Sequence, residues 1–437
     1  MRRALPIALL QMMLIGIVTV FCLQSVLQGN LLVHSHAQVR VSRRNISGRN
    51  KWGQYDYYTL KQSDGFVLAR APRGADGQPL DPPVPVAHFT DGFGLLESDN
   101  VLSMQLSPDG LFLAIDGTRD HGEQVWMYDT QHGTISLTPP YVMGNFLHWL
   151  PGVTSHMFLY RPMFPLGPSA PMDGGGWNPG LWEVDAATGT HKNIDIGVPS
   201  AFLIDAAPSP DGKRIIYATT LGLGMGSDTW LMNIDGGSSP SAKLAERVSI
   251  PRGSRTHLFG MPGGAQSIAG LFAWSPDGTT VAYERLSDSP TPFLPAGLWV
   301  VDDHGGQQRR LADADGGHGY IPIWSPDGHK IVFVERTNVG DQRADTNVQS
   351  LQSAIAVVDV TSGRAWVLAS PTQTGMLINA NPVWAPDGNS VTFTAFNPIN
   401  RVLGGMPRYW SVRVIGPNVQ SAVVPLTSTL TGVVAVG

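Results

Sequence analysis

A tight-turn sequence that returns through most of the chain limits its possible folds more than any other feature. The tetrapeptide Ser-Pro-Asp-Gly occurs four times, and a fifth copy begins with Ala: residues 107–110, 209–212, 275–278, 325–328 and 385–388. Pro fixes φ at the second position of such a turn, Asp is tolerated at the third, and Gly accepts a positive φ at the fourth. One turn recurring at intervals of this kind indicates a repeat protein whose units stack on their neighbours.

Tryptophan precedes the last three copies of the turn, and a degenerate copy, residues 149–152, fills the long gap between the first two. Aligned on the residue before the turn, the units are anchored at positions 106, 149, 208, 274, 324 and 384. The residues that we assign to the structural turn motif are Pro108, Asp109, Gly110, Pro210, Asp211, Gly212, Trp274, Pro276, Asp277, Gly278, Trp324, Pro326, Asp327, Gly328, Trp384, Pro386, Asp387 and Gly388.

Each turn is followed by short stretches with the alternating pattern of strands, such as 281–283, 298–301 and 366–368. Four short strands in a unit of about 50 residues are typical of a propeller blade. One blade cannot bury both of its faces, so neighbouring blades must stack, and we expect the tryptophans to be wedged between them. The predicted fold is therefore all-β: a β-propeller of four-stranded antiparallel blades.

Both ends of the repeat region contain further strand-like sequence. Residues 55–61, 66–70 and 84–89 read as the second, third and fourth strands of a blade that lacks its first, and residues 431–436 read as a lone strand. Together they would form one blade closed by both ends of the chain, which removes exposed sheet edges. We therefore predict seven blades within a propeller domain at 52–437, with six blades as the alternative.

The Trp-Ser-Pro-Asp-Gly turn with its following strands resembles the WD40-like (PD40) repeat of TolB-like β-propellers, over about residues 100–426. TolB itself resembles a six-bladed ring, which supports the six-bladed alternative. The same repeat occurs in periplasmic scaffold proteins and in propellers attached to prolyl-oligopeptidase-like hydrolases. The resemblance therefore implies the fold and does not choose between binding and catalysis.

The N-terminal region predicts a membrane segment. Residues 4–33 contain no charged side chain and are long enough to cross a bilayer as a helix, and Arg2 and Arg3 favour a cytoplasmic N-terminus. We assign 1–37 to a membrane anchor, which makes the propeller extracytoplasmic. The alternative is a signal peptide cleaved after Ser35-His36-Ala37, which would leave a secreted or periplasmic protein.

Charge is unevenly divided along the chain. No Asp or Glu precedes Asp56, whereas seven Lys and Arg residues do, five of them in or beside the linker that we place at 38–51. Removing these seven positive charges from the net charge of −5 leaves −12 for the remainder. An acidic body repels phosphate backbones, so we expect no nucleic-acid partner.

Long segments fall almost wholly on the face opposite the repeated turns, at 161–180, 246–270, 285–297, 336–353 and 396–408. Loops on a rigid scaffold often carry binding, and Arg and aromatic residues are favoured interface anchors. We expect a monomeric propeller that binds a protein or peptide at the cell envelope through this face, unless these loops pack on one another and merely cover the channel. The candidate residues are Arg161, Trp177, Arg255, His257, Phe293, Arg336, Arg343, Arg401 and Arg408.

Signatures of enzyme chemistry are absent from the sequence. It has no G-x-S-x-G, H-E-x-x-H, P-loop or C-x-x-C motif, so we assign no catalytic, metal-binding or cofactor-binding residue. Asp313, Asp315 and His318 are interpreted as a polar turn rather than a calcium site. The dipeptides 284–285 and 335–336, both Glu-Arg, are interpreted as local salt bridges. The function that we predict is binding; the alternative is a propeller hydrolase or lyase acting on a sugar or lactone at the channel mouth.

Overall fold

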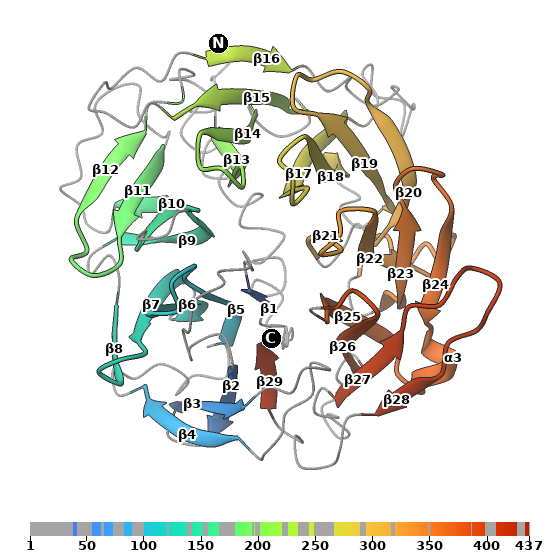
Figure 1. Ribbon diagram of the computed structural model, residues 1–437, viewed down its shortest axis with the longest axis horizontal. Helices are drawn as coiled ribbons and strands as arrows, with labels where there is room; N and C mark the ends of the chain where they lie inside the picture. Colours follow the sequence, from blue (N-terminus) through green and yellow to red (C-terminus); the bar gives the residue numbers. More distant parts are fainter. Residues whose placement is uncertain are drawn as a thin grey trace, which may run out of the picture.

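The computed structural model describes a ring of β-sheets around a central axis (Figure 1). The described residues are 38–41, 55–62, 65–72, 83–89, 100–119, 122–137, 142–151, 156–165, 180–194, 196, 202–220, 226–234, 244–248, 266–288, 294–315, 320–347, 350–385, 387–397, 408–425 and 433–436. Within these ranges the strands form six sheets of four strands and one sheet of five.

Around the ring, the sheets follow one another in the same order as along the chain. The first contains β5 (Asn100–Leu106), β6 (Phe112–Arg119), β7 (Gly122–Asp129) and β8 (Thr134–Leu137). The second contains β9 (Val142–Trp149), β10 (Met157–Pro165), β11 (Leu181–Asp185) and β12 (His191–Ile194). The third contains β13 (Phe202–Pro208), β14 (Arg214–Thr220), β15 (Asp228–Asn233) and β16 (Leu244–Val248).

Three further sheets repeat the pattern. One contains β17 (Gln266–Trp274), β18 (Thr280–Asp288), β19 (Ala296–Asp302) and β20 (Arg309–Ala314). The next contains β21 (Ile323–Trp324), β22 (Lys330–Arg336), β23 (Ser353–Asp359) and β24 (Ala365–Ala369). The last contains β25 (Ile378–Trp384), β26 (Ser390–Phe396), β27 (Arg408–Arg413) and β28 (Val423–Pro425).

Both ends of the chain meet in the remaining four-stranded sheet. β29 (Val433–Val436) pairs antiparallel with β2 (Tyr55–Gln62), which continues into β3 (Gly65–Pro72) and β4 (Val84–His88). A short strand, β1 (Gln38–Val41), adds to the axial edge of β5 and is the fifth strand of that sheet. Figure 1 shows β1, β5 and β29 near the centre of the ring.

The repeated tetrapeptides form the turns between the first and second strands, as predicted. In the third copy Ser275 Oγ donates to Asp277 Oδ1 at 2.5 Å, and the Gly278 amide donates to the Ser275 carbonyl at 2.9 Å. The φ angle of Gly278 is 73°, in the left-handed region that favours glycine. The turns at 107–110, 209–212 and 325–328 repeat these bonds, and the turn at 385–388 keeps the Gly–Ala backbone bond. We call the side of the ring that carries them the turn face, and the opposite side the insertion face.

Tryptophans at the unit anchors join neighbouring sheets. Each donates its indole Nε1–H to the backbone carbonyl that lies just before the anchor position of the preceding unit. The bonds run from Trp149 to Gln105 (2.9 Å), Trp274 to Ala207 (3.0 Å), Trp324 to Ala273 (2.8 Å) and Trp384 to Ile323 (3.0 Å). The expectation that tryptophans lie between the blades is therefore confirmed. Anchor positions 106 and 208 hold Leu and Pro, which have no such donor.

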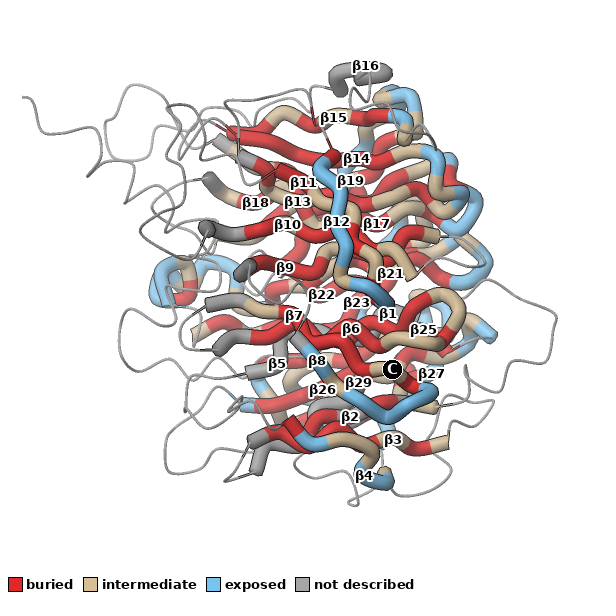
Figure 2. Tube along the Cα trace, turned by 90° about the vertical axis from the view of Figure 1, so that its left-hand side faces the viewer, coloured by how far each residue is buried: buried red, intermediate tan, exposed pale blue. Residues whose placement is uncertain are grey.

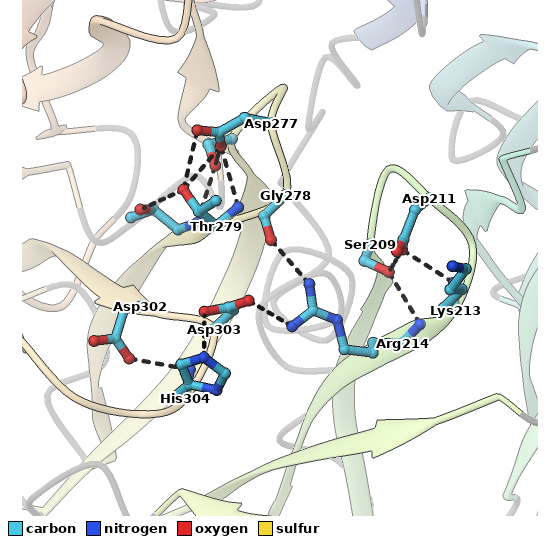
Figure 3. A network of polar contacts seen from close by, with 12 residues as sticks. Ser209, Asp211, Lys213, Arg214, Asp277, Gly278, Thr279, Asp302, Asp303 and His304 are labelled. Carbon is cyan, nitrogen blue, oxygen red and sulfur yellow. Dashed lines mark hydrogen bonds and ion pairs between the residues drawn. The ribbon is translucent and has the colours of Figure 1, made fainter.

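Arg214 adds a polar link across the turn face (Figure 3). From β14 it reaches the next sheet, where it pairs with Asp303 at 2.6 Å, donates to the Gly278 carbonyl at 3.0 Å and lies over the Trp274 ring. Both ionic partners are mostly buried, so the pair is less screened by solvent than an exposed one. The turn face therefore has short connections and a polar link between neighbouring sheets.

The hydrophobic core is divided into clusters, several of which combine residues of adjacent sheets, as stacked blades require. Seen from the side, buried residues fill the inner strands, and exposed residues gather in the connecting turns and in outer strands such as β12 (Figure 2). The helix in the described part of the chain is α3 (Pro371–Thr374), and no described helix is long and apolar enough to cross a membrane. The N-terminal helix expected in residues 1–37 lies outside the described residues.

The indole bonds can be tested with two matched substitutions. Trp324 and Trp410 are similarly buried, at 8% and 9% exposure, but the Trp410 indole N–H has no hydrogen-bond partner among the described residues. Trp→Phe removes the same volume at both sites, whereas W324F also leaves a buried carbonyl without its donor. We expect W324F to lower the free energy of unfolding in urea by about 1–2 kcal/mol more than W410F. Equal losses would show that the bond contributes nothing.

The turn carboxylates predict acid sensitivity. The Ser275 hydroxyl lowers the pKa of Asp277 against the opposing effect of burial, and the Ser209 hydroxyl does the same for Asp211. A lowered folded-state pKa contributes stability above the unfolded value of about 3.9 and loses it as pH falls through the folded value. Between pH 5 and the acid limit, the unfolding free energy of D277N should therefore depend less steeply on pH than that of the parent. Parallel curves in denaturant titrations would contradict this assignment.

Candidate functional site

A buried arginine organises the described loop between β22 and β23 on the insertion face. The Arg336 side chain is fully buried and pairs with Asp345 at 2.8 Å. The same Nη2 lies 3.3 Å from the Asn338 carbonyl and 3.1 Å from the Asp341 carbonyl, both of which accept hydrogen bonds. Because a buried guanidinium is costly without partners, these contacts fix the path of the loop around it.

Further bonds close the two ends of this loop against each other. The Asn338 amide group donates to the Ser350 carbonyl at 2.8 Å, and its Oδ1 accepts the Gln352 amide at 3.0 Å. Ala344 and Leu351 are fully buried in the core cluster below the loop. Residues 337–352 therefore form an ordered platform within the described ranges, which exclude 348–349.

The base of the platform is tied to the next sheet. The Ser353 hydroxyl donates to the Asn379 carbonyl at 3.0 Å, and the Asn379 side chain returns a bond to the Ser353 carbonyl at 2.8 Å. Thr374 of α3 donates to Asn379 Oδ1 at 2.9 Å. All three residues are buried, so β23 and β25 are joined at the point where the loop ends.

The platform presents apolar and cationic side chains to solvent. Val339 is 64% exposed, and the side chain of Arg343 is 84% exposed. Arg343 lies 3.4 Å from Asp341, and its hydrogen bonds lower the pKa of that carboxyl group. Leu377, which is 39% exposed, lies nearby because its carbonyl accepts the Ser353 amide. Neither Val339 nor Leu377 was predicted from the sequence as a binding residue. Gly340, next to Val339, has a φ of 93° and forms a tight turn there.

The structure corrects the prediction that Arg336 is a partner-binding residue. Its side chain is fully buried and braces the loop from below, so it cannot reach a partner directly. Arg161, on β10, also makes internal contacts: it donates to the Ile204 carbonyl at 2.5 Å and to Asn145 Oδ1 at 2.6 Å, which links two sheets. Arg343 is exposed as a binding residue must be.

The remaining candidates are not brought together by the described structure. Trp177, Arg255, His257, Phe293 and Arg401 lie outside the described residues. Arg408 begins β27, where its backbone is paired with Ala395. Their role in binding stays a prediction.

Two buried acids form a second polar feature, between the sheets of β18 and β22. Glu284 and Asp315 are each 2% exposed, and the Asp315 amide donates to the Val334 carbonyl at 2.9 Å. Burial, together with the neighbouring Asp315 charge, raises the pKa of Glu284 well above its ordinary range. The same two causes raise the pKa of Tyr320. A carboxyl group kept protonated in this way can donate a proton or a hydrogen bond.

The structure places the two Glu-Arg dipeptides differently, and a local salt bridge forms at Arg336. Arg285 donates to Ser267 and lies over the Trp299 ring, while Glu284 is buried beside Asp315. Arg336 pairs with Asp345 rather than with its neighbour Glu335. Successive side chains on a strand point to opposite faces, so neighbours in sequence do not meet.

The three residues of the acidic turn 313–318 also differ in their surroundings. Asp313 is exposed and pairs with Arg310, whereas Asp315 is buried; His318 lies outside the described residues. Across the described residues, no three His, Cys, Asp or Glu side chains are grouped as a metal ion would require.

No protein-family model and no curated protein matches the chain. Among solved structures, an oligogalacturonate lyase from Vibrio parahaemolyticus is similar at 12% identity, over 88% of this chain and 90% of that one, with a TM-score of 0.51. A prolyl endopeptidase is similar at 13% identity, over 87% of this chain and 49% of that one, with a TM-score of 0.52. TolB from Acinetobacter baumannii is similar at 16% identity, with a TM-score of 0.42.

The TolB match covers 72% of this chain, which spans 63% of the TolB chain. At such identities these likenesses concern the fold alone. The predicted all-β propeller fold is confirmed at that level.

The role of Arg336 in holding the loop can be tested by comparing its substitution with that of Arg343. R336M would leave the mostly buried Asp345 without its partner, and we expect a loss of about 3 kcal/mol in unfolding free energy. The exposed control R343M should change it by about 0.5 kcal/mol or less. Amide exchange of residues 337–347 should rise in R336M more than elsewhere. Unchanged exchange in this loop would show that Arg336 does not hold it.

Proposed function

We propose that the protein is an envelope-associated, non-catalytic β-propeller that binds a protein or peptide partner through its insertion face. The observation that carries this proposal is the platform 337–347, a surface loop held in one conformation by a buried arginine. A loop that is already ordered loses little conformational entropy on binding, so its exposed side chains contribute more of their contact energy to affinity. Val339 and Arg343 supply the apolar contact and the charge.

The envelope location rests on the sequence. Residues 4–33 would act as an anchor that leaves the propeller outside the cytoplasm, with cleavage after 35–37 as the alternative route to a periplasmic or secreted protein. The repeat resembles that of TolB-like propellers, which include periplasmic scaffold proteins, and this resemblance supports a protein partner in that compartment. A ring closed through β29 and β2, which leaves only short outer edge strands, favours a monomeric propeller.

We also infer that the ring has seven blades rather than six. The sheet of β29, β2, β3 and β4 has the four strands of a complete blade, and β4 contacts β8 of the following sheet. Its first strand comes from the C-terminus, so the hydrogen bonds between β29 and β2 close the ring.

The partner surface can be located by site-specific photocrosslinking in cells. A photoreactive residue replacing Arg343 should give one major protein adduct, and replacing Lys213, which is exposed on the turn face, should give none. The double variant V339D/R343E should reduce recovery of that same partner at least tenfold, whereas K213E should leave it unchanged. An adduct at position 213 alone, or full recovery with V339D/R343E, would contradict the proposed surface.

A second candidate function, an enzyme acting on a sugar, is favoured by the buried pair Glu284 and Asp315 and the raised pKa of Glu284. The similar oligogalacturonate lyases suggest the substrate to try. Purified protein would be incubated with oligogalacturonate and Mn²⁺, with E284Q as the comparison. Unsaturated products formed by the parent and lost in E284Q would support this candidate, and no product from the parent would remove it.

A further inference from the structure

The direction of β1 shows on which side the N-terminal region leaves the propeller. β1 runs parallel to β5, with Gln38 opposite Ser103 and Val41 opposite Leu106. Because β5 ends at the turn 107–110, β1 also runs toward the turn face. Residue 38 is therefore its end nearer the insertion face, and the chain that precedes it comes from that side.

The distance from β1 to the apolar segment is short. Ser103 is three residues from Asn100, where β5 begins, which is about 10 Å along the strand. Four residues, 34–37, separate Gln38 from the last residue of the uncharged segment 4–33, and they span at most about 14 Å. A membrane-embedded segment 4–33 would therefore end close to the insertion face, near the axis of the ring.

The two faces of the ring differ in what they offer a bilayer. The described insertion face presents exposed Val339, Leu377 and Arg343, and Arg343 is paired with the neighbouring Asp341. Apolar side chains with a cation among them suit the interface of a membrane that contains anionic lipids. The turn face also exposes Ile415 and Val419, but its repeated turns carry exposed carboxylates whose pKa values are lowered, so that they remain ionised; these are Asp211, Asp277, Asp327 and Asp387.

We propose that the insertion face lies against the membrane and contacts anionic phospholipid head groups through Val339, Leu377 and Arg343. This inference rests on the proposed anchoring by residues 4–33 and adds the orientation of the ring. A protein partner of the insertion face would then be reached at the membrane surface, and the turn face would point away from the bilayer.

The orientation can be measured with the full chain in vesicles of phosphatidylcholine and phosphatidylglycerol. With Cys22 replaced by Ser, the variants V339C and V419C place one environment-sensitive fluorophore on each face. Both valines are well exposed, at 64% and 53%, and Val419 lies in the loop between β27 and β28 on the turn face. We expect a quencher attached to the lipid head groups to quench the label at 339 at least threefold more than the label at 419. Equal quenching, or more at 419, would overturn the orientation.

A spacer variant tests whether β1 and the short linker cause this orientation. Twenty Gly-Ser residues inserted between 37 and 38 would add a flexible tether of about 25 Å, and the difference between the two labels should then shrink. A parent chain that fails to float with vesicles would refute the anchoring and this inference with it, but not the partner crosslink at 343. Shielding of position 339 in native membranes but not in pure lipid would identify a protein rather than lipid as the occupant.

Discussion

The indole hydrogen bond from one sheet to the next is the interaction on which this ring depends. Four tryptophans place an N–H on the carbonyl that precedes the anchor of the preceding sheet, so each bond fixes the register of two neighbouring units. Apolar contacts alone would hold the sheets together without setting how far one slides along the other. The bonds lie beside the repeated turns, so they link neighbouring sheets on this face of the ring.

The two faces of the ring differ in the length of their connections. The turn face uses short tetrapeptides and the Arg214 pair, and it leaves little chain available for a partner. The insertion face carries the loop whose conformation is set by buried Arg336 and by the Ser353–Asn379 contacts beneath it. A scaffold that holds an exposed valine and arginine in place is suited to recognition, whether the surface that it meets is a protein or a lipid.

The sequence predicts the parts of this structure that depend on local chemistry. Pro, Asp and Gly dictate the turn wherever they occur together, and strand alternation follows from each turn, so the fold could be expected from the sequence. The orientation of Arg336 and the burial of Glu284 could not, because both depend on which elements pack above and below a strand end. The pairing of Arg336 with Asp345 rather than with Glu335 could not be read from the sequence either, because successive side chains on a strand point to opposite faces.

The central claim is that the turn face holds the ring together and the insertion face makes the contacts. Hydroxyl-radical footprinting of the full chain, compared between native membranes and purified protein, tests it without assuming the nature of the contact. The account predicts that Val339 and Arg343 lose reactivity in membranes, while Val419 and Lys213 keep it. Equal protection of both pairs, or protection confined to Val419 and Lys213, would contradict the account.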